Sequence, residues 1–198
     1  MLNNNNDLHY IIFDIETQNT FDQVGSRDAA ALSISLLVTW DSKTKEYKSY
    51  LENELEQLWP VLEQVDMLVG YNSDHFDIPL LNKYYPGDLT AIKSLDLLKE
   101  IHNVLGRRLR LDDVAAATLG TKKSGHGLDA IRWWEAGEIE KIRKYCQKDV
   151  EITKRIFDYI LKHGSVKYKD FNKKKDLGIN TSQWLKPTSF ALTHTLGF

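Results

Sequence analysis

Residues 13–17 read Phe13-Asp14-Ile15-Glu16-Thr17 and close a strand-like run from Tyr10 to Phe13. Side chains alternate between the two faces of a strand, so Asp14 and Glu16 point to one side and Ile15 to the other. Two neighbouring carboxylates repel each other, and keeping both ionised requires a positive charge between them. A divalent metal ion would supply that charge. The alternative is a solvated strand edge that binds nothing.

The composition is that of one ordinary domain. The chain has 198 residues, of which 42% are hydrophobic, and this is enough for a real core. The single cysteine, Cys146, excludes an internal disulfide framework, and we find no leading apolar segment and no apolar run of membrane length. We therefore expect a cytoplasmic protein with no membrane association. The net charge of -2 gives no global basic field, so nucleic acid would have to be held by local patches or by metal.

The first half of the chain changes from strands to alternating strands and helices. Two further strands, 31–40 and 46–51, should form an antiparallel meander with the first, and the polar segment 18–28 should pass close to the acid pair. The later elements are a helix with a break at Pro60 (52–65), strands 67–71 and 92–95, and helices 76–84 and 97–105. We therefore predict an α/β fold: a mixed sheet, made of a three-strand antiparallel meander and two parallel strands, covered by helices.

The second half is predominantly helical. The pattern predicts helices over 111–119, 127–135 and 137–162, the last of which ends at Gly164. Beyond Gly164 the composition changes. Residues 166–169 and 178–184 could pair as a β-hairpin across 171–175.

A second group of polar residues follows the strand predicted at 67–71. Asp77 lies there at the start of a predicted helix, with Pro79 in its first turn. Open α/β sheets commonly bind ligands at this edge. The alternative is that Asn72, Ser73 or Asp77 only caps the helix.

A third group lies on the last long helix. Tyr145 and Asp149 are one helical turn apart, so their side chains share a face that is otherwise apolar. A carboxylate on such a face needs a metal, a cation or a hydrogen-bond donor. The alternative is that Tyr145 donates a hydrogen bond to Asp149 in a purely structural pair.

Together, the three groups supply four carboxylates from separated segments. Such a set suits a two-metal phosphoryl-transfer site, where ions about 4 Å apart activate water and stabilise the leaving oxygen.

The ordered trio also resembles a known family. The motifs Asp14-Ile15-Glu16, Tyr71-Asn72-x-x-x-Phe76-Asp77 and Tyr145-Cys146-x-x-Asp149 are similar to the three exonuclease motifs of the DEDD superfamily, in its tyrosine branch. That family includes the proofreading domain of family-B DNA polymerases and stand-alone predicted 3′-to-5′ exonucleases of ribonuclease-H-like fold. The likeness extends from about Tyr10 to about Gly164. It therefore implies a ribonuclease-H-like exonuclease domain over 1–164. The family says little about residues 165–198, which we expect to form a C-terminal extension packed on the same domain.

The resemblance also implies residue roles. Asp14 would bridge two Mg²⁺ or Mn²⁺ ions, Glu16 and Asp149 would complete the tighter site, and Asp77 would serve the second ion. Tyr145 would orient the attacking water. The expected substrate-binding residues are Thr17, Asn72 and Phe76, although Phe76 could equally be core. The implied function is a metal-dependent 3′-to-5′ exonuclease that hydrolyses phosphodiester bonds at the 3′ end of single-stranded DNA or RNA.

Two other readings remain open at this stage. One is a catalytically idle nucleic-acid-binding or partner-recruiting module that keeps the fold, and the other is a structural Ca²⁺ site. Several basic clusters could hold backbone phosphate or simply be solvated: Arg107, Arg108 and Arg110; Lys122 and Lys123; and the lysines of 167–175, with Tyr168, Phe171 and Trp184 as stacking faces.

Overall fold

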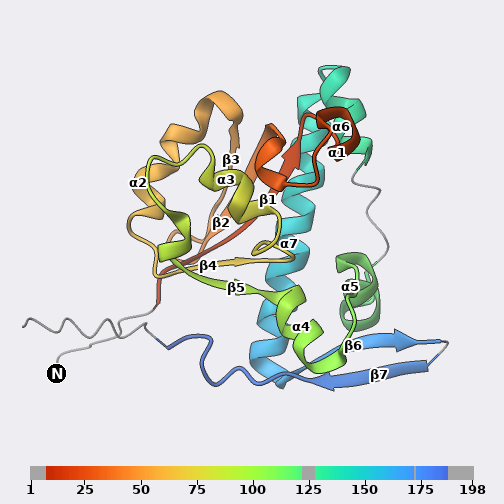
Figure 1. Cartoon of the computed structure of the whole chain (residues 1–198). Helices are drawn as coiled ribbons and strands as arrows, with labels where there is room; N and C mark the ends of the chain where they lie inside the picture. Colours follow the sequence, from red (N-terminus) through yellow and green to blue (C-terminus); the bar gives the residue numbers. More distant parts are fainter. Residues whose placement is uncertain (1–7, 122–127, 172, 187–198) are drawn as a thin grey trace, which may run out of the picture.

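A five-stranded mixed sheet forms the centre of the molecule (Figure 1). The computed structural model describes residues 8–121, 128–171 and 173–186. The strand order is β3-β2-β1-β4-β5; β1 to β3 are antiparallel neighbours, and β4 and β5 run parallel to β1. The strands are β1 (Tyr10–Thr17), β2 (Ile34–Asp41), β3 (Tyr47–Leu51), β4 (Met67–Gly70) and β5 (Lys93–Asp96). The predicted mixed sheet is confirmed.

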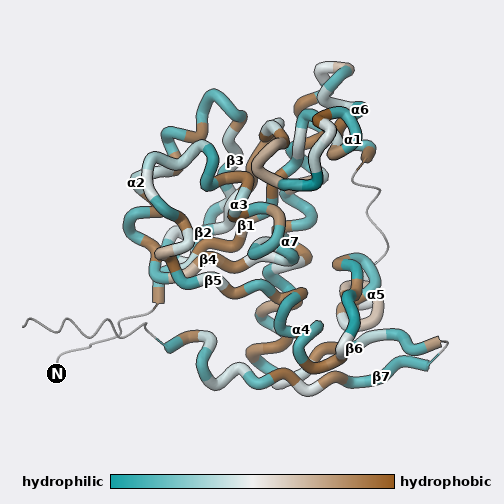
Figure 2. Tube along the Cα trace, viewed as in Figure 1, coloured by the Kyte–Doolittle hydropathy of each residue, from teal (hydrophilic) through white to brown (hydrophobic). Residues whose placement is uncertain are grey.

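Helices cover both faces of this sheet. The face that carries Ile12 packs against α7 (Ile139–His163), α4 (Leu97–Leu105) and α5 (Leu111–Leu119). The opposite face, which carries Ile11 and Phe13, packs against α2 (Trp59–Leu62), α3 (Asp77–Asn82) and short 3₁₀ turns at Ala29–Ala31 and Leu89–Ala91. Figure 2 shows hydrophobic residues concentrated along the strands in the middle. The two-residue period of β1 therefore sends alternate side chains into two separate cores.

The structure differs from the sequence prediction in three local elements. The expected helix over 52–65 is two pieces, a 3₁₀ helix at Glu52–Gln57 and α2, with Pro60 in the first turn of α2. The expected loop 18–28 contains a short helix, α1 (Phe21–Val24), which Thr20 caps through its side chain. Strand β1 runs on to Thr17 with a register shift between Glu16 and Thr17, so the acid pair belongs to the strand itself.

The C-terminal extension does form a β-hairpin, but with a different second strand. β6 (Ser165–Asp170) pairs with β7 (Lys173–Gly178), so the strand predicted at 178–184 is wrong. The reason is that β7 is rich in lysine, a residue depleted in strands, and only Leu177 in it is buried. The segment after β7 instead brings Trp184 onto Phe157 of α7, with the two rings stacked 5.8 Å apart.

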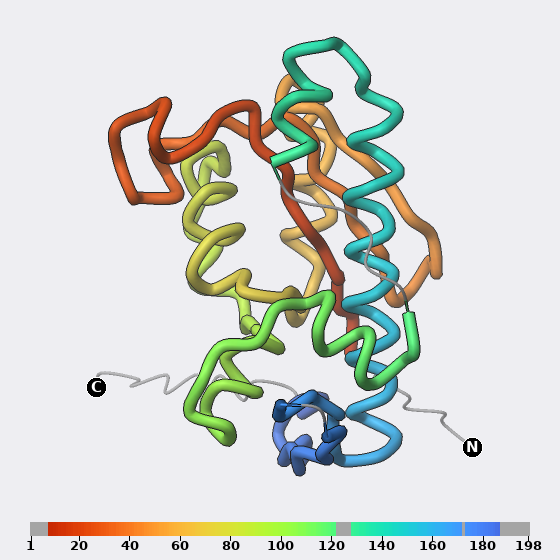
Figure 3. Tube along the Cα trace, turned by 90° about the vertical axis from the view of Figure 1, so that its right-hand side faces the viewer, coloured from red at the N-terminus to blue at the C-terminus, as the bar shows by residue number. Residues whose placement is uncertain are grey.

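Figure 3 shows α7 running along the molecule, with the hairpin beside its C-terminal end. The helix ends at Gly164, whose left-handed backbone (φ 63°) lets the chain turn directly into β6. At the other end, α7 packs against α6 (Leu128–Glu135). None of the helices in the described part of the chain is long and apolar enough to cross a membrane.

Candidate active site

Strand β1 and helix α7 meet at Asp14. The buried thiol of Cys146, on α7, donates hydrogen bonds to the main-chain oxygen of Asp14 at 3.3 Å and to its carboxylate at 3.5 Å. Ligand atoms of Asp14, Glu16 and Cys146 lie within 4.8 Å of one another. The first acid pair is therefore packed directly against the helix that carries Tyr145 and Asp149.

Asp77 joins this group from the opposite side of the strand. It is only 4% exposed, and its carboxylate accepts a hydrogen bond of 3.0 Å from the main-chain N–H of Ile15. Phe76 precedes α3 without a capping hydrogen bond, whereas the Asp77 carboxylate accepts from its own main-chain N–H as well as from Ile15, so Asp77 does more than cap this helix. The bond to Ile15 holds Asp77 beside Asp14 and Glu16, although 62 residues separate it from the strand.

The carboxylates perturb one another electrostatically. Burial raises the pKa of Asp14 well above its ordinary value, and the charges of Asp77, Glu16 and Asp149 raise it further. Burial and the charges of Asp149 and Asp77 likewise raise the pKa of Glu16. The pKa of Asp77 rises to about 7, mainly through burial, against the opposing effect of the Ile15 hydrogen bond. These groups lie close enough to repel each other, as a shared cation site requires.

Tyr145 lies within the electrostatic field of the same carboxylates. Burial raises the pKa of its hydroxyl, and the negative charges of Asp149, Glu16 and Asp14 raise it further. The ring packs edge-on against Trp133 of α6, with centroids 5.8 Å apart. Tyr145 therefore stays neutral near pH 7 and presents a hydroxyl that can donate a hydrogen bond.

The donor set fits hard divalent cations. Carboxylate oxygens are the ligands that Mg²⁺ and Mn²⁺ prefer, and the mutual repulsion described above is relieved when positive charge enters the group. Cys146 is a poor ligand for such ions because burial raises the pKa of its thiol, which stays protonated as a hydrogen-bond donor to Asp14. The four carboxylates predicted from the sequence are therefore the residues that could hold the metals.

A largely apolar pocket of about 410 Å³ opens beside Glu16. Thr17 and Phe76 both line it, while the Thr17 hydroxyl donates to the main-chain oxygen of Asn19. Phe76 is half-buried and packs edge-on against Phe21 at 6.1 Å, so it contacts the core and the pocket at once. Further apolar lining residues, among them Phe21, Leu128 and Ile131, were not predicted from the sequence. Leu128 is the most distinctive, because 65% of its surface is exposed, which is unusual for a leucine.

Asn72 lies apart from Thr17 and Phe76. It lines a different pocket, of about 260 Å³, instead of the apolar one. Its backbone has a left-handed conformation (φ 69°), and its main-chain N–H donates to the Asp96 carboxylate at 2.7 Å. Its side-chain oxygen accepts a hydrogen bond from Arg108. The three residues expected to bind substrate thus divide between two separate pockets.

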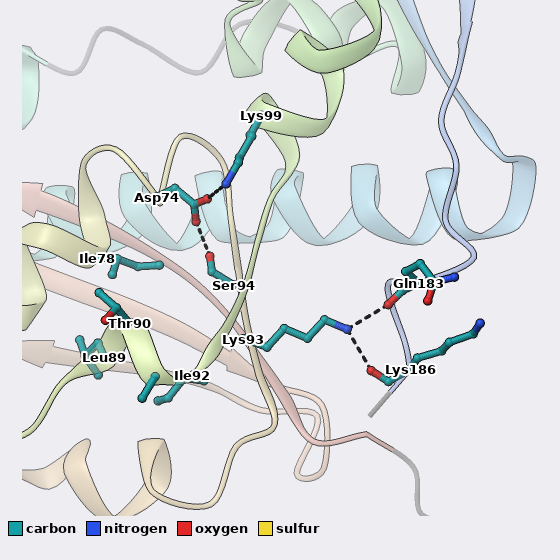
Figure 4. Close-up of a pocket in the computed structure, with 11 residues that line it drawn as sticks. Asp74, Ile78, Leu89, Thr90, Ile92, Lys93, Ser94, Lys99, Gln183 and Lys186 are labelled. Atoms are coloured by element: carbon teal, nitrogen blue, oxygen red, sulfur yellow. Dashed lines mark hydrogen bonds and ion pairs between the residues drawn. The ribbon is translucent and has the colours of Figure 1, made fainter. Parts of the chain in front are cut away.

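A larger cavity, of about 870 Å³, lies next to the C-terminal segment (Figure 4). Asp74 accepts hydrogen bonds there from Ser94 at 2.5 Å and Lys99 at 2.7 Å, and Lys93 donates to the main-chain oxygens of Gln183 and Lys186. These contacts join the C-terminal segment to the sheet. Asp96 also has a structural role, since it caps α4 through the N–H groups of Leu98 and Lys99.

The basic cluster of Lys122 and Lys123 lies outside the described residues.

The sequence and the fold both resemble those of known proteins. A sequence model of the RNase H superfamily matches residues 11–161. Among solved structures, the family B DNA polymerase from the hyperthermophilic archaeon Pyrobaculum calidifontis is similar in fold, with a TM-score of 0.58 and 19% identity. The similar region covers 78% of this chain and 24% of the polymerase chain, so this chain spans about a quarter of that polymerase. Since the sequence match covers most of the chain and the observed sheet agrees with it, the chain belongs to the RNase H superfamily.

Proposed function

We propose that this protein is a metal-dependent 3′-to-5′ exonuclease that hydrolyses phosphodiester bonds at the 3′ end of single-stranded DNA or RNA. One observation carries the proposal. Asp14, Glu16, Asp77 and Asp149 come from three separated segments, and their charges act on one another and on Tyr145. Converging carboxylates of this kind repel each other and weaken the fold, so their presence is best explained by cations that they hold.

The four carboxylates would hold two Mg²⁺ or Mn²⁺ ions. By the family resemblance, Asp14 would serve both ions, and Glu16, Asp149 and Asp77 would supply the remaining carboxylate oxygens. When bound, the two ions supply positive charge that activates water and stabilises the leaving oxygen. The Ile15 and Cys146 hydrogen bonds would hold Asp77 and Asp14 in fixed orientations for this task.

The remaining residues of the site would position the substrate. The neutral hydroxyl of Tyr145 can donate a hydrogen bond to the attacking water and so orient it toward phosphorus. The apolar pocket beside Glu16 has room for one unpaired base, for which Phe76 and Leu128 provide apolar contact. A base can enter such a pocket only when it is unpaired, and this favours a single-stranded 3′ end. A reducing compartment such as the cytoplasm suits the site, because Cys146 must stay a thiol to donate its hydrogen bond to Asp14.

The first test is Asp14→Asn. This change keeps the side chain's shape and removes one of the charges needed to hold the ions. We expect Mn²⁺-dependent release of mononucleotides from a 3′-labelled oligonucleotide to fall about a thousandfold or more, with the melting temperature retained. Glu56→Gln, which removes an acidic charge from an exposed site on the 3₁₀ helix that follows β3, is the matched control and should leave turnover unchanged.

The results separate the proposal from the two other readings. Unchanged turnover in Asp14→Asn would contradict the assignment of this site. Oligonucleotide binding by the wild-type protein without any metal-stimulated cleavage would favour the idle binding module. Metal-dependent melting with no nuclease activity would favour a structural ion site.

A further inference from the structure

A basic pocket of about 380 Å³ lies between the start of α5 and strand β6. We call it the arginine pocket and define it by the residues Arg107, Arg108, Arg110, Asp113, Tyr168 and Lys169. Its two walls come from segments about 60 residues apart, the short connection between α4 and α5 and the C-terminal hairpin. Four of its side chains are cationic and one is acidic, in a chain whose net charge is -2. Positive charge is therefore concentrated at this pocket, although the chain as a whole has a net negative charge.

The pocket is a built feature of the fold. Arg107 spans the two walls: its guanidinium lies 5.6 Å from the ring centre of Tyr168 and 3.4 Å from both the Lys169 main-chain oxygen and the Asp170 carboxylate. The arginine segment is also tied to the sheet, because the buried hydroxyl of Tyr71 donates to the Leu109 main-chain oxygen at 2.9 Å. Helix α5 packs against β6 directly. These contacts hold Arg107 and the backbone of the arginine segment in place before any ligand arrives.

The arginine pocket adjoins the candidate active site. Arg108 lines both this pocket and the smaller one that contains Asn72, and it donates a hydrogen bond to the Asn72 side chain. The main-chain oxygen of Asn72 in turn accepts a hydrogen bond of 3.1 Å from the N–H of Phe76, the residue before Asp77. On the other side, the charge of Asp112, at the start of α5, raises the pKa of Tyr145. A chain of contacts thus leads from the carboxylates to the arginines.

Two of the cations are available to a ligand. Arg110 and Lys169 are exposed, and within residues 8–121, 128–171 and 173–186 neither side chain forms an ion pair. Arg107, in contrast, is paired with Asp170. The guanidinium of Arg110 can bind phosphate oxygens with two parallel hydrogen bonds, and the ring of Tyr168 offers a face on which a base can stack.

We propose that the arginine pocket binds the phosphodiester backbone of a single-stranded nucleic acid, on the 5′ side of the bond that the carboxylates would cleave. The 5′ direction of the bound strand rests on the proposed exonuclease function. If the 3′-terminal nucleotide lies at the carboxylates, all the remaining strand lies 5′ to it. The strand leaves the carboxylates past Asn72 and reaches Arg110 and Lys169, which bind its phosphates. The C-terminal hairpin is thereby part of the substrate-binding surface as well as part of the core.

The test measures binding in the absence of cleavage. We would use full-length protein carrying Asp14→Asn, with EDTA present, and follow the fluorescence anisotropy of a labelled single-stranded oligonucleotide at several salt concentrations. The test variant adds Arg110→Ala and Lys169→Ala, whose side chains hold no ion pair among the described residues. The matched control adds Lys43→Ala and Lys48→Ala, two exposed lysines near β3 at the opposite edge of the sheet. The melting temperatures of both variants confirm that the fold is retained.

We expect the test variant to bind at least about tenfold more weakly, and the control within about twofold of the parent. Two lost phosphate contacts should reduce the slope of log affinity against log salt by about 1.4 in the test variant alone. If the test variant and the control variant bind with equal affinity and show an equal slope of log affinity against log salt, the proposal is overturned. Equal competition by a polyglutamate peptide of the same charge would also overturn it, because the pocket would then be a general acceptor of acidic chains.

The result does not depend on turnover. Loss of binding in the test variant, together with a wild-type protein that cleaves nothing, would support the phosphate-binding assignment and remove the exonuclease. Active, metal-dependent cleavage together with unchanged binding in the test variant would remove the arginine pocket alone.

Discussion

Tyr145 is surrounded by negative charge, and this decides what its hydroxyl can do. Asp149, Glu16 and Asp14 all raise its pKa, in addition to burial. A phenol with a raised pKa does not give up its proton near pH 7, so Tyr145 acts as a hydrogen-bond donor and not as a base. The edge-on contact with Trp133 fixes the plane of its ring. A residue in this position can direct a water molecule without changing its own charge.

Tyr145→Phe tests this role. The change removes the hydroxyl and keeps the ring against Trp133, so we expect kcat to fall about 10- to 100-fold while KM changes little. The shape of the pH–rate profile should be the same in the variant and the wild type, because the hydroxyl does not titrate in the working range. Tyr159→Phe, 14 residues further along α7, is the control. A rate that rises with pH at the alkaline end in the wild type, and no longer does so in Tyr145→Phe, would instead identify the tyrosine as a base.

At the scale of elements, α7 connects the site to the C-terminal hairpin. Its N-terminal half carries Tyr145, Cys146 and Asp149, and its C-terminal half carries Phe157, on which Trp184 stacks. Trp184 is only 4% exposed, and its indole N–H donates to Glu100 of α4 at 3.2 Å. Val166 and Leu177 of the hairpin are buried in the same core. The extension is thus packed on the domain that carries the carboxylates.

Trp184→Ala tests how much this packing contributes. Removing a buried indole leaves a cavity against Phe157, and we expect the free energy of unfolding to fall by about 3–5 kcal/mol. Trp184→Phe keeps a ring for stacking and loses the hydrogen bond to Glu100 and part of the buried ring surface, so it should cost less, about 1–2 kcal/mol. Urea denaturation of the metal-free protein measures both values. A loss below about 1 kcal/mol in Trp184→Ala would show that the extension contributes little to the core.

At the scale of the whole molecule, the carboxylates couple stability to pH. The folded protein raises the pKa of Asp77 to about 7, well above the value near 4 that the unfolded chain has. Between these two values the folded state binds a proton that the unfolded state has already lost. Stability from this group is therefore present in full at low pH and is lost as the pH rises toward 7 and above. Burial of Asp14 and Glu16 acts in the same direction.

The corresponding prediction concerns the metal-free protein. In EDTA, the melting temperature should fall as the pH is raised from 5.5 to 8, and Mn²⁺ should restore it at pH 8 because bound cations favour the ionised carboxylates. Asp77→Asn, which keeps an oxygen acceptor for the Ile15 N–H, should flatten this pH dependence. A melting temperature in EDTA that is the same at both pH values would contradict the proposed strain among the carboxylates.

The sequence was sufficient for features that depend on local periodicity. The two-residue alternation of β1 places Asp14 and Glu16 together, and the turn at 41–43 and the later strand–helix alternation lead to the mixed sheet. The bounds of α4 agree with the prediction, and α7 ends at Gly164 because a glycine readily adopts the left-handed conformation found there. The lysine-rich strand β7 was placed wrongly. Lysine has a low preference for strands, so the residues of β7 do not reveal its pairing with β6.

Only the tertiary structure determined which distant side chains meet. The bond from Ile15 to Asp77 joins residues 62 positions apart, and the thiol of Cys146 reaches Asp14 across 132 positions. The apolar pocket formed by Phe21, Phe76 and Leu128, and the placement of Arg107 over Tyr168, likewise depend on packing between elements. Sequence periodicity reports which face of its own element a residue lies on. The residue's contacts with other elements depend on how the helices pack on both faces of the sheet to bury the two cores. That packing exists only in the folded chain.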